Sequence, residues 1–204
     1  MGRDHEIMSL VNSLRYLAVF EKKTSILYED VAEKLESPLA RALLQNISLD
    51  CRKHAISLRG IALSMSKSGF ILDMPRTMKE TWDSIDAFQI ELSKVDTISQ
   101  KDMAKLSEQL TRWEDTLAAE YYGLLQFNTI DLLHKQMSKP YKVDFETLKT
   151  ILLQAQHDEE YHREILVMVM ELLKREELAE TDNTPRVSFR NPDAWSRTDM
   201  PTVS

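Results

Sequence analysis

The sequence predicts an all-α protein in which four long helices form two helical hairpins joined by a long crossover. Three observations carry this expectation. The 204 residues include only 4 glycines and 6 prolines, and 43% are hydrophobic and 29% charged, a composition typical of amphipathic helices. Apolar residues recur at helical spacing over long stretches. The expected connections are short, long and short, which suits a four-helix bundle with one crossover.

The first hairpin begins with a helix over residues 6–36. One face of it repeats every seven residues, at Ile7, Leu14, Glu21, Tyr28 and Leu35. Ser37 and Pro38 then serve as N-cap and first-turn proline of a second helix. This second helix runs to about residue 67, where Ser68-Gly69 ends it.

The long connection covers residues 70–98 and carries a short amphipathic helix of its own. Its apolar residues at helical spacing are Met78, Trp82, Ile85, Phe88 and Leu92. A crossover of this length allows the second hairpin to lie beside the first.

The second hairpin starts at Ser99, which with Asp102 resembles a capping box. Its first helix ends near Ser138, because Lys139-Pro140 follows. Asp144 caps the last long helix, which runs to about residue 177.

We therefore expect one domain over residues 1–177 and a flexible tail over 178–204. The tail holds three prolines and shows no periodicity. Its aromatic residues, Phe189 and Trp195, either pack on the domain or dock on a partner.

Charge, apolar run length and cysteine number exclude several classes of protein. The net charge of −7 and the pI near 5.3 argue against a nucleic-acid-binding surface. No run of about 18 apolar residues exists, so we expect no membrane span. Cys51 is the single cysteine, which precludes an intrachain disulfide and fits a reducing, cytoplasmic setting.

A duplicated pattern of charged residues is the strongest functional signal. The repeated unit is a glutamate behind an aromatic residue, with a tyrosine seven residues on and Asp-x-x-x-His one helix later. Its two copies are Phe20-Glu21, Tyr28, Asp50 and His54, and Trp113-Glu114, Tyr121, Asp158 and His162. Charged side chains in a helix seam cost free energy unless they pair or bind a cation. The duplication therefore predicts a shared metal site.

Helix geometry indicates which of these side chains meet at one ion. Residues seven apart lie about 20° apart around the axis, so each glutamate shares a face with its tyrosine. Residues three apart also share a face, which brings Glu159 to the same ion as His162, with Asp158 as a near alternative. Carboxylates and imidazoles together suit iron, manganese or zinc. The expected ligands are Glu21, His54, Glu114, Glu159 and His162.

This order of residues, spread from about Glu6 to Arg175, resembles the ferritin-like superfamily and, within it, the rubrerythrin branch. The single cysteine excludes the rubredoxin-type iron domain of rubrerythrins. The resemblance implies a four-helix bundle with a di-iron or di-manganese carboxylate centre. With iron it implies oxygen or peroxide chemistry, in which Tyr28 and Tyr121 donate hydrogen bonds to the ligands or quench radicals. The family also pairs bundles into homodimers.

One position departs from the family. The residue three before His54 is Cys51, where the family has a bridging glutamate. The three glutamates supply three negative charges, whereas two divalent ions need four for neutrality. Asp50 can supply the fourth, and so can a Cys51 thiolate, which favours a softer metal such as zinc. With neither, one ion leaves a mononuclear site near −1.

Two functions from different classes follow. The first is a ferritin-like metal-binding protein, a non-haem iron oxidoreductase of the ferroxidase or peroxidase type with a partly degenerate site. The second is a bundle without redox activity, a binding or structural module in which Glu21 pairs with His54 or His162. Binding of a small apolar ligand in the interior is a third. In each case we expect a homodimer, with Trp82 and Phe88 either at its interface or covering the bundle.

Overall fold

The computed structural model describes residues 2–65, 76–126 and 145–181. Every element in these ranges is an α-helix, so the all-α prediction is confirmed. None of the described helices is both long and apolar enough to cross a membrane. The elements are α1 (Gly2–Glu33), α2 (Pro38–Met65), α3 (Arg76–Leu92), α4 (Gln100–Gln126) and α6 (Phe145–Thr181).

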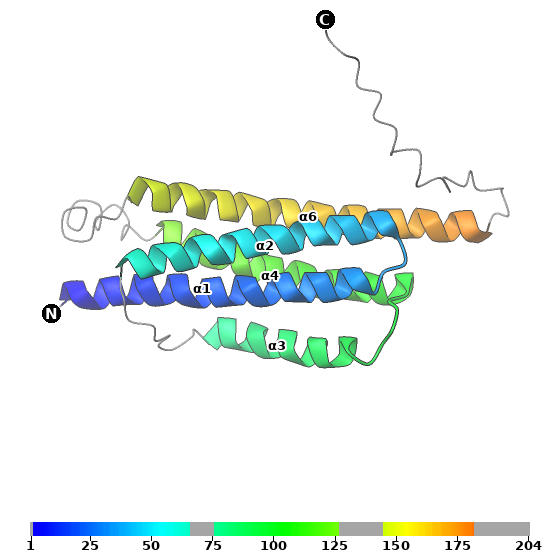
Figure 1. The fold of residues 1–204 in the computed structure, drawn as a ribbon, viewed down its shortest axis with the longest axis horizontal. Helices are drawn as coiled ribbons and strands as arrows, with labels where there is room; N and C mark the ends of the chain where they lie inside the picture. Colours follow the sequence, from blue (N-terminus) through cyan, green and yellow to red (C-terminus); the bar gives the residue numbers. More distant parts are fainter. Residues whose placement is uncertain (1, 66–75, 127–144, 182–204) are drawn as a thin grey trace, which may run out of the picture.

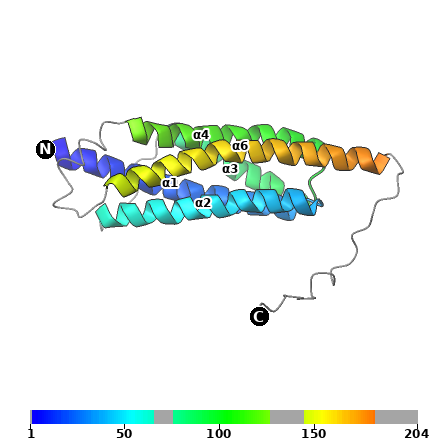
Figure 2. The same ribbon diagram turned by 90° about the horizontal axis from the view of Figure 1, so that it is seen from above.

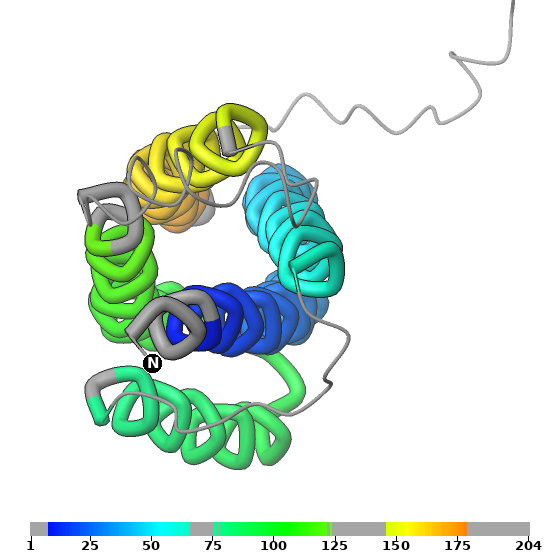
Figure 3. The backbone as a smooth tube through the Cα atoms, turned by 90° about the vertical axis from the view of Figure 1, so that its left-hand side faces the viewer, coloured from blue at the N-terminus to red at the C-terminus, as the bar shows by residue number. Residues whose placement is uncertain are grey.

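The four long helices run alongside one another, and α3 lies outside them (Figure 1). Helix α1 packs on α2 and α4 packs on α6, which gives two antiparallel pairs, and the pairs meet through α2 and α6 (Figure 2). Seen from the end, the four surround a common interior, and α3 contacts α1 and α4 from outside (Figure 3). Side chains pointing inward from all four long helices therefore meet in this interior.

The turn between α1 and α2 explains where both helices stop and start. Helix α1 ends at Glu33, three residues before the expected end, because the amide of Lys34 bonds the carbonyl of Val31 in a tightened last turn. The Ser37 hydroxyl then accepts a hydrogen bond from the amide of Ala40 at 3.3 Å. Ser37 is thus the expected N-cap of α2. The expected stop at Ser68-Gly69 lies outside the described residues.

Helix α4 starts where its cap predicts. The Ser99 hydroxyl accepts a bond from the amide of Asp102 at 3.2 Å and donates to the Asp102 carboxylate at 2.6 Å. Asp102 thus stands at the glutamate position of a capping box, but its carboxylate binds the Ser99 hydroxyl. The expected end near Ser138 lies outside the described residues, as does the Asp144 cap of α6.

Helix α3 packs its aromatic face on α1 and α4. Trp82 meets Phe20 edge-to-face at 6.2 Å between ring centroids, and Phe88 meets Trp113 at 5.7 Å. Lys23 lies 3.9 Å from the centroid of the Trp82 ring and also pairs with Asp86 of α3. Trp82 and Phe88 are thus used within the chain, and of the two roles expected for them the covering role is the one observed.

Helix α6 extends four residues beyond the expected limit of 177 and ends at Thr181. The apolar pattern does stop near residue 178, where Leu178 is exposed. An exposed helical end needs no apolar face, so the helix outlasts its pattern. The remainder of the expected tail, with Phe189 and Trp195, lies outside the described residues.

Candidate metal centre

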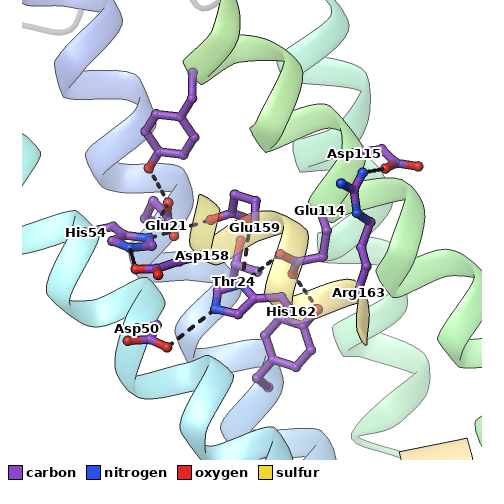
Figure 4. Close-up of polar contacts among 12 residues, drawn as sticks. Glu21, Thr24, Asp50, His54, Glu114, Asp115, Asp158, Glu159, His162 and Arg163 are labelled. Atoms are coloured by element: carbon purple, nitrogen blue, oxygen red, sulfur yellow. Dashed lines mark hydrogen bonds and ion pairs between the residues drawn. The ribbon is translucent and has the colours of Figure 1, made fainter. Parts of the chain in front are cut away.

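Five buried side chains from four helices meet in the interior (Figure 4). Glu21 comes from α1, His54 from α2, Glu114 from α4, and Glu159 and His162 from α6; none is more than 3% exposed. They form two groups of three, Glu21–His54–Glu159 and Glu114–Glu159–His162, with the candidate ligand atoms of each group within 4.8 Å of one another. Buried glutamates and histidines are thus arranged so that they can hold a metal ion, and Glu159 belongs to both groups.

The Nδ1 atoms of both histidines face the carboxylates. His54 Nδ1 lies 3.2 Å from Glu21 Oε1 and 3.5 Å from Glu159 Oε1. His162 Nδ1 lies 3.0 Å from Glu114 Oε2 and 3.7 Å from Glu159 Oε2. Each imidazole therefore points its Nδ1 between the glutamate of its own hairpin and the shared Glu159.

The two tyrosines exchange partners between the hairpins. The Tyr28 hydroxyl donates to Glu114, and the Tyr121 hydroxyl donates to Glu21. Burial and the nearby carboxylates raise the pKa of both phenols well above the usual value, which keeps them as donors. Both tyrosines therefore hold and orient a candidate ligand.

The two aspartates of the duplicated pattern are also exchanged. Asp158 of α6 lies 2.9 Å from Nε2 of His54 on α2, and Asp50 of α2 lies 3.7 Å from Nε2 of His162 on α6 (Figure 4). A carboxylate on the outer nitrogen fixes the ring orientation and leaves the inner nitrogen for the ion. The spacing Asp-x-x-x-His predicts that each aspartate shares a helix face with its own histidine. Because α2 packs against α6, each aspartate instead contacts the histidine of the other helix.

Lys53 joins the two aspartates and was not identified from the sequence. Its ammonium lies 2.7 Å from Asp50 and 3.0 Å from Asp158, at the partly exposed edge of the site. Two hydrogen bonds raise its pKa against the effect of burial. The only feature of the sequence that indicated this role was the three-residue spacing between Asp50 and Lys53. Such a spacing is equally typical of an ion pair on an exposed helix face.

The remaining expected residues lie beside the two groups rather than in them. Asp158 contacts the outer nitrogen of His54, and Asp50 lies 3.7 Å from the outer nitrogen of His162. Cys51 is fully buried but belongs to neither group of the described residues. Glu120, six residues after Glu114 on α4, accepts a hydrogen bond from the Tyr16 hydroxyl at 2.9 Å instead.

The pKa values of Glu159 and Glu114 shift in opposite directions. Burial, then the carboxylates of Glu114 and Glu21, raise the pKa of Glu159 well above its usual range. Burial acts in the same sense on Glu114, but the neighbouring Glu159, His162 and Tyr28 favour its charged form and lower its pKa overall. Without a cation, Glu159 therefore keeps a proton beside an ionised Glu114.

Both histidines hold protons more firmly than usual. Burial lowers the pKa of His54, but Glu159 and Glu21 outweigh it and raise the value to about 10. Burial also lowers the pKa of His162, but the hydrogen bond and the charge of Glu114 outweigh it, so the pKa is raised overall. In the metal-free protein each imidazole lies against a buried carboxylate, His54 against Glu21 and His162 against Glu114.

The stability of the metal-free protein should fall as the pH rises from about 6.5 to 10. Below the usual pKa of about 6.5, His54 is protonated in the folded and unfolded states, so its stabilising contribution is complete. Between 6.5 and 10 only the folded state keeps the proton, and each unit of difference is worth about 1.4 kcal/mol. Urea unfolding across this range checks the slope. His54→Gln should flatten it, whereas the exposed His157→Gln should leave it unchanged, and an unchanged slope in His54→Gln would contradict the assignment.

Unpaired buried atoms test whether a cation fits. Both carboxylate oxygens of Glu159, Oε2 of Glu21 and Nε2 of His162 have no hydrogen-bond partner among the described residues. Buried polar atoms without partners cost free energy. A divalent cation bound by these carboxylate oxygens would remove that cost. The residues present therefore fit a metal ion.

Asp158→Asn should weaken metal binding about 10- to 100-fold, because the His54 ring loses the carboxylate that orients it. Asp50→Asn is the matched change and should have a smaller effect, since its carboxylate lies farther from His162 Nε2. Isothermal titration of both variants with zinc measures the difference. Equal losses would contradict the assigned asymmetry.

A groove lies on another part of the molecule. It has a volume of about 520 Å³ on the outer faces of α1 and α2, between residues 15–26 and 52–63. Its lining combines apolar residues such as Ile26 and Ile56 with cations such as Lys22 and Arg59. It shares no residue with the metal centre.

Comparison of the chain with protein-family models, with curated proteins and with solved structures finds no match.

Proposed function

We propose that this chain is a ferritin-like metal-binding protein whose interior binds two divalent cations side by side. One observation carries the proposal: Glu159 belongs to both ligand groups and has both carboxylate oxygens without a hydrogen-bond partner among the described residues. A carboxylate between two Glu/His pairs is placed to bridge two ions. The two antiparallel helix pairs and the crossover also support the ferritin-like four-helix arrangement.

The residues around the ions have separate tasks in this proposal. Glu21 with His54 holds one cation, Glu114 with His162 holds the other, and Glu159 joins them. The tyrosine hydroxyls orient Glu21 and Glu114, and the aspartates orient the imidazole rings. Bound iron would supply the electrons for a ferroxidase or peroxidase reaction with oxygen or peroxide. Loading requires the protons on the histidines and Glu159 to leave, so affinity should rise with pH.

A second candidate is a bundle with no redox activity. The observation in its favour is that each histidine already contacts a glutamate directly, His54 with Glu21 and His162 with Glu114. Such pairs neutralise the buried charges without a cation and can fix the register of the helices. In this case the centre serves the fold of a binding or structural module.

Metal titration separates the two candidates. Protein freed of metal is titrated anaerobically with ferrous iron, manganese and zinc, and bound ions are counted by elemental analysis. We expect two ions per chain and a rise of several degrees in Tm, because a ligand at 100 times its Kd stabilises the fold by about 2.7 kcal/mol per site. No binding of any of the three ions would leave the second candidate.

Redox activity needs its own measurement. After anaerobic loading with ferrous iron, oxygen or peroxide is added and the absorbance of ferric product is followed against a metal-free sample. A product that forms faster than in buffer supports the oxidoreductase. Binding without such a change supports a metal-binding protein of another kind. The homodimer stays a prediction, which analytical ultracentrifugation tests.

A further inference from the structure

Cys51 occupies the position in the first hairpin that Glu159 occupies in the second. Cys51 precedes His54 by three residues, as Glu159 precedes His162. The contacts of the centre repeat between the hairpins with partners exchanged, for both tyrosines and both aspartates. The same exchange relates Cys51 to the shared carboxylate. Cys51 is therefore the first hairpin's counterpart of the shared carboxylate, on the buried face of α2 that carries His54.

The surroundings of the thiol agree with this placement. Cys51 is fully buried, is not in a disulfide and lies on the face of α2 that carries His54. Burial raises the pKa of the thiol, and so do the negative charges of Glu21, Glu114 and Glu159. Independently, the unpartnered oxygens of Glu159 and Glu21 mark the same interior as a place for a cation.

Asp50, the other candidate for the fourth anionic ligand, is used elsewhere. Its carboxylate binds Lys53 at 2.7 Å and lies 3.7 Å from the outer nitrogen of His162. Its side chain is also 32% exposed, whereas the ligand groups are buried. Asp50 thus supports the centre from its rim.

The charge and the number of ligands both call for one more anion inside. Three carboxylates balance three of the four positive charges of two divalent ions, and a fully buried site needs near neutrality. Each ligand group also holds only three residues, one short of the four ligands of a tetrahedral ion. A single thiolate between the ions corrects both shortfalls.

We propose that Cys51 Sγ is a bridging thiolate ligand of the two-cation centre and makes it selective for zinc-like ions over manganese. This inference rests on the proposed metal-binding function. As the metal–sulfur bonds form, the thiol proton passes to the buffer, and nothing is oxidised or reduced. The ligands of each ion are then one imidazole nitrogen, two carboxylate oxygens and the shared sulfur, a set that suits zinc or cobalt better than a hard ion.

Anaerobic titration of the full-length protein with cobalt tests the sulfur directly. We expect two ions per chain and a near-ultraviolet thiolate-to-cobalt charge-transfer band that grows in proportion to binding. X-ray absorption of the zinc-loaded wild type should show a sulfur shell at about 2.3 Å. This second measurement needs no variant.

Two substitutions complete the test. Cys51→Ser should keep the visible cobalt bands, lose the charge-transfer band, bind fewer than two ions and lower the ratio of zinc to manganese affinity at least about tenfold. Cys51→Glu should restore two ions without the band and favour manganese. Circular dichroism of the metal-free variants checks that each is folded.

The outcomes distinguish this inference from the function on which it rests. If wild type and both variants bind no cation, the proposed function fails. If Cys51→Glu alone binds, the natural chain is a bundle that has lost its metals, and both proposals fail. If wild type binds two ions with no sulfur shell, and Cys51→Ser binds them equally, the metal centre stands and the thiolate ligand is overturned.

Discussion

Glu159→Gln is expected to abolish the binding of both cations while leaving the metal-free protein as stable as before. The shared carboxylate is the one side chain that both ligand groups contain, so its loss should weaken each site more than about 100-fold, or about 2.7 kcal/mol. In the metal-free protein Glu159 is held in its neutral form, which glutamine matches in shape. The new amide also has donors for the unpaired oxygen of Glu21, so stability should change by less than about 1 kcal/mol or rise.

Titration calorimetry with zinc and urea unfolding without metal check the two halves of this prediction. Glu160→Gln is the matched control, because Glu160 is the next residue on α6 and is exposed. It should change neither quantity. If Glu159→Gln retained one tight site, the carboxylate would serve a single ion and the bridged arrangement would be wrong.

Glu114→Ala should instead destabilise the metal-free protein severely. Glu114 accepts hydrogen bonds from the Tyr28 hydroxyl and from Nδ1 of His162, and its removal leaves an imidazolium and a phenol buried without partners. Breaking a buried ion pair from one side costs about 3–5 kcal/mol. The contrast with Glu159 arises because Glu114 accepts two hydrogen bonds in its charged form, whereas neither carboxylate oxygen of Glu159 has a hydrogen-bond partner among the described residues.

The control for this substitution is the neighbouring Asp115→Ala. Asp115 pairs with Arg163, but both side chains are largely in solvent, where an ion pair contributes about 0–1 kcal/mol. Chemical denaturation at pH 7 measures both variants. A loss for Glu114→Ala no larger than that for Asp115→Ala would show that the buried contacts do not stabilise the fold.

Much of the helical framework follows from local chemistry. Ser37 and Ser99 cap the helices that their sequence context predicts, because a cap is satisfied by amides only three residues away. The helix ends were predicted less accurately, at Glu33 as well as at Thr181, since the last turn of a helix can tighten or can continue without an apolar pattern. The position of the aromatic face of α3 was left open, because two surfaces were available to it.

The candidate ligands also show which features local spacing predicts and which it does not. A glutamate and a tyrosine seven residues apart share a helix face whatever the helix packs against, so their inward orientation was predictable. The partner of each tyrosine and each aspartate was not, because both lie on the opposite hairpin. Lys53 was missed for the same reason, since its second partner, Asp158, is 105 residues away.

The sequence by itself determined which residues form helices and which polar side chains face inward, because helix periodicity and capping depend on neighbours within two turns. Tertiary structure alone decided how those side chains pair. The packing of α2 against α6 crosses the histidine–aspartate pairs, places Glu159 in both ligand groups and leaves Asp50 at the rim. Side-chain distances across a bundle depend on the rotation and offset of whole helices, which no local spacing specifies.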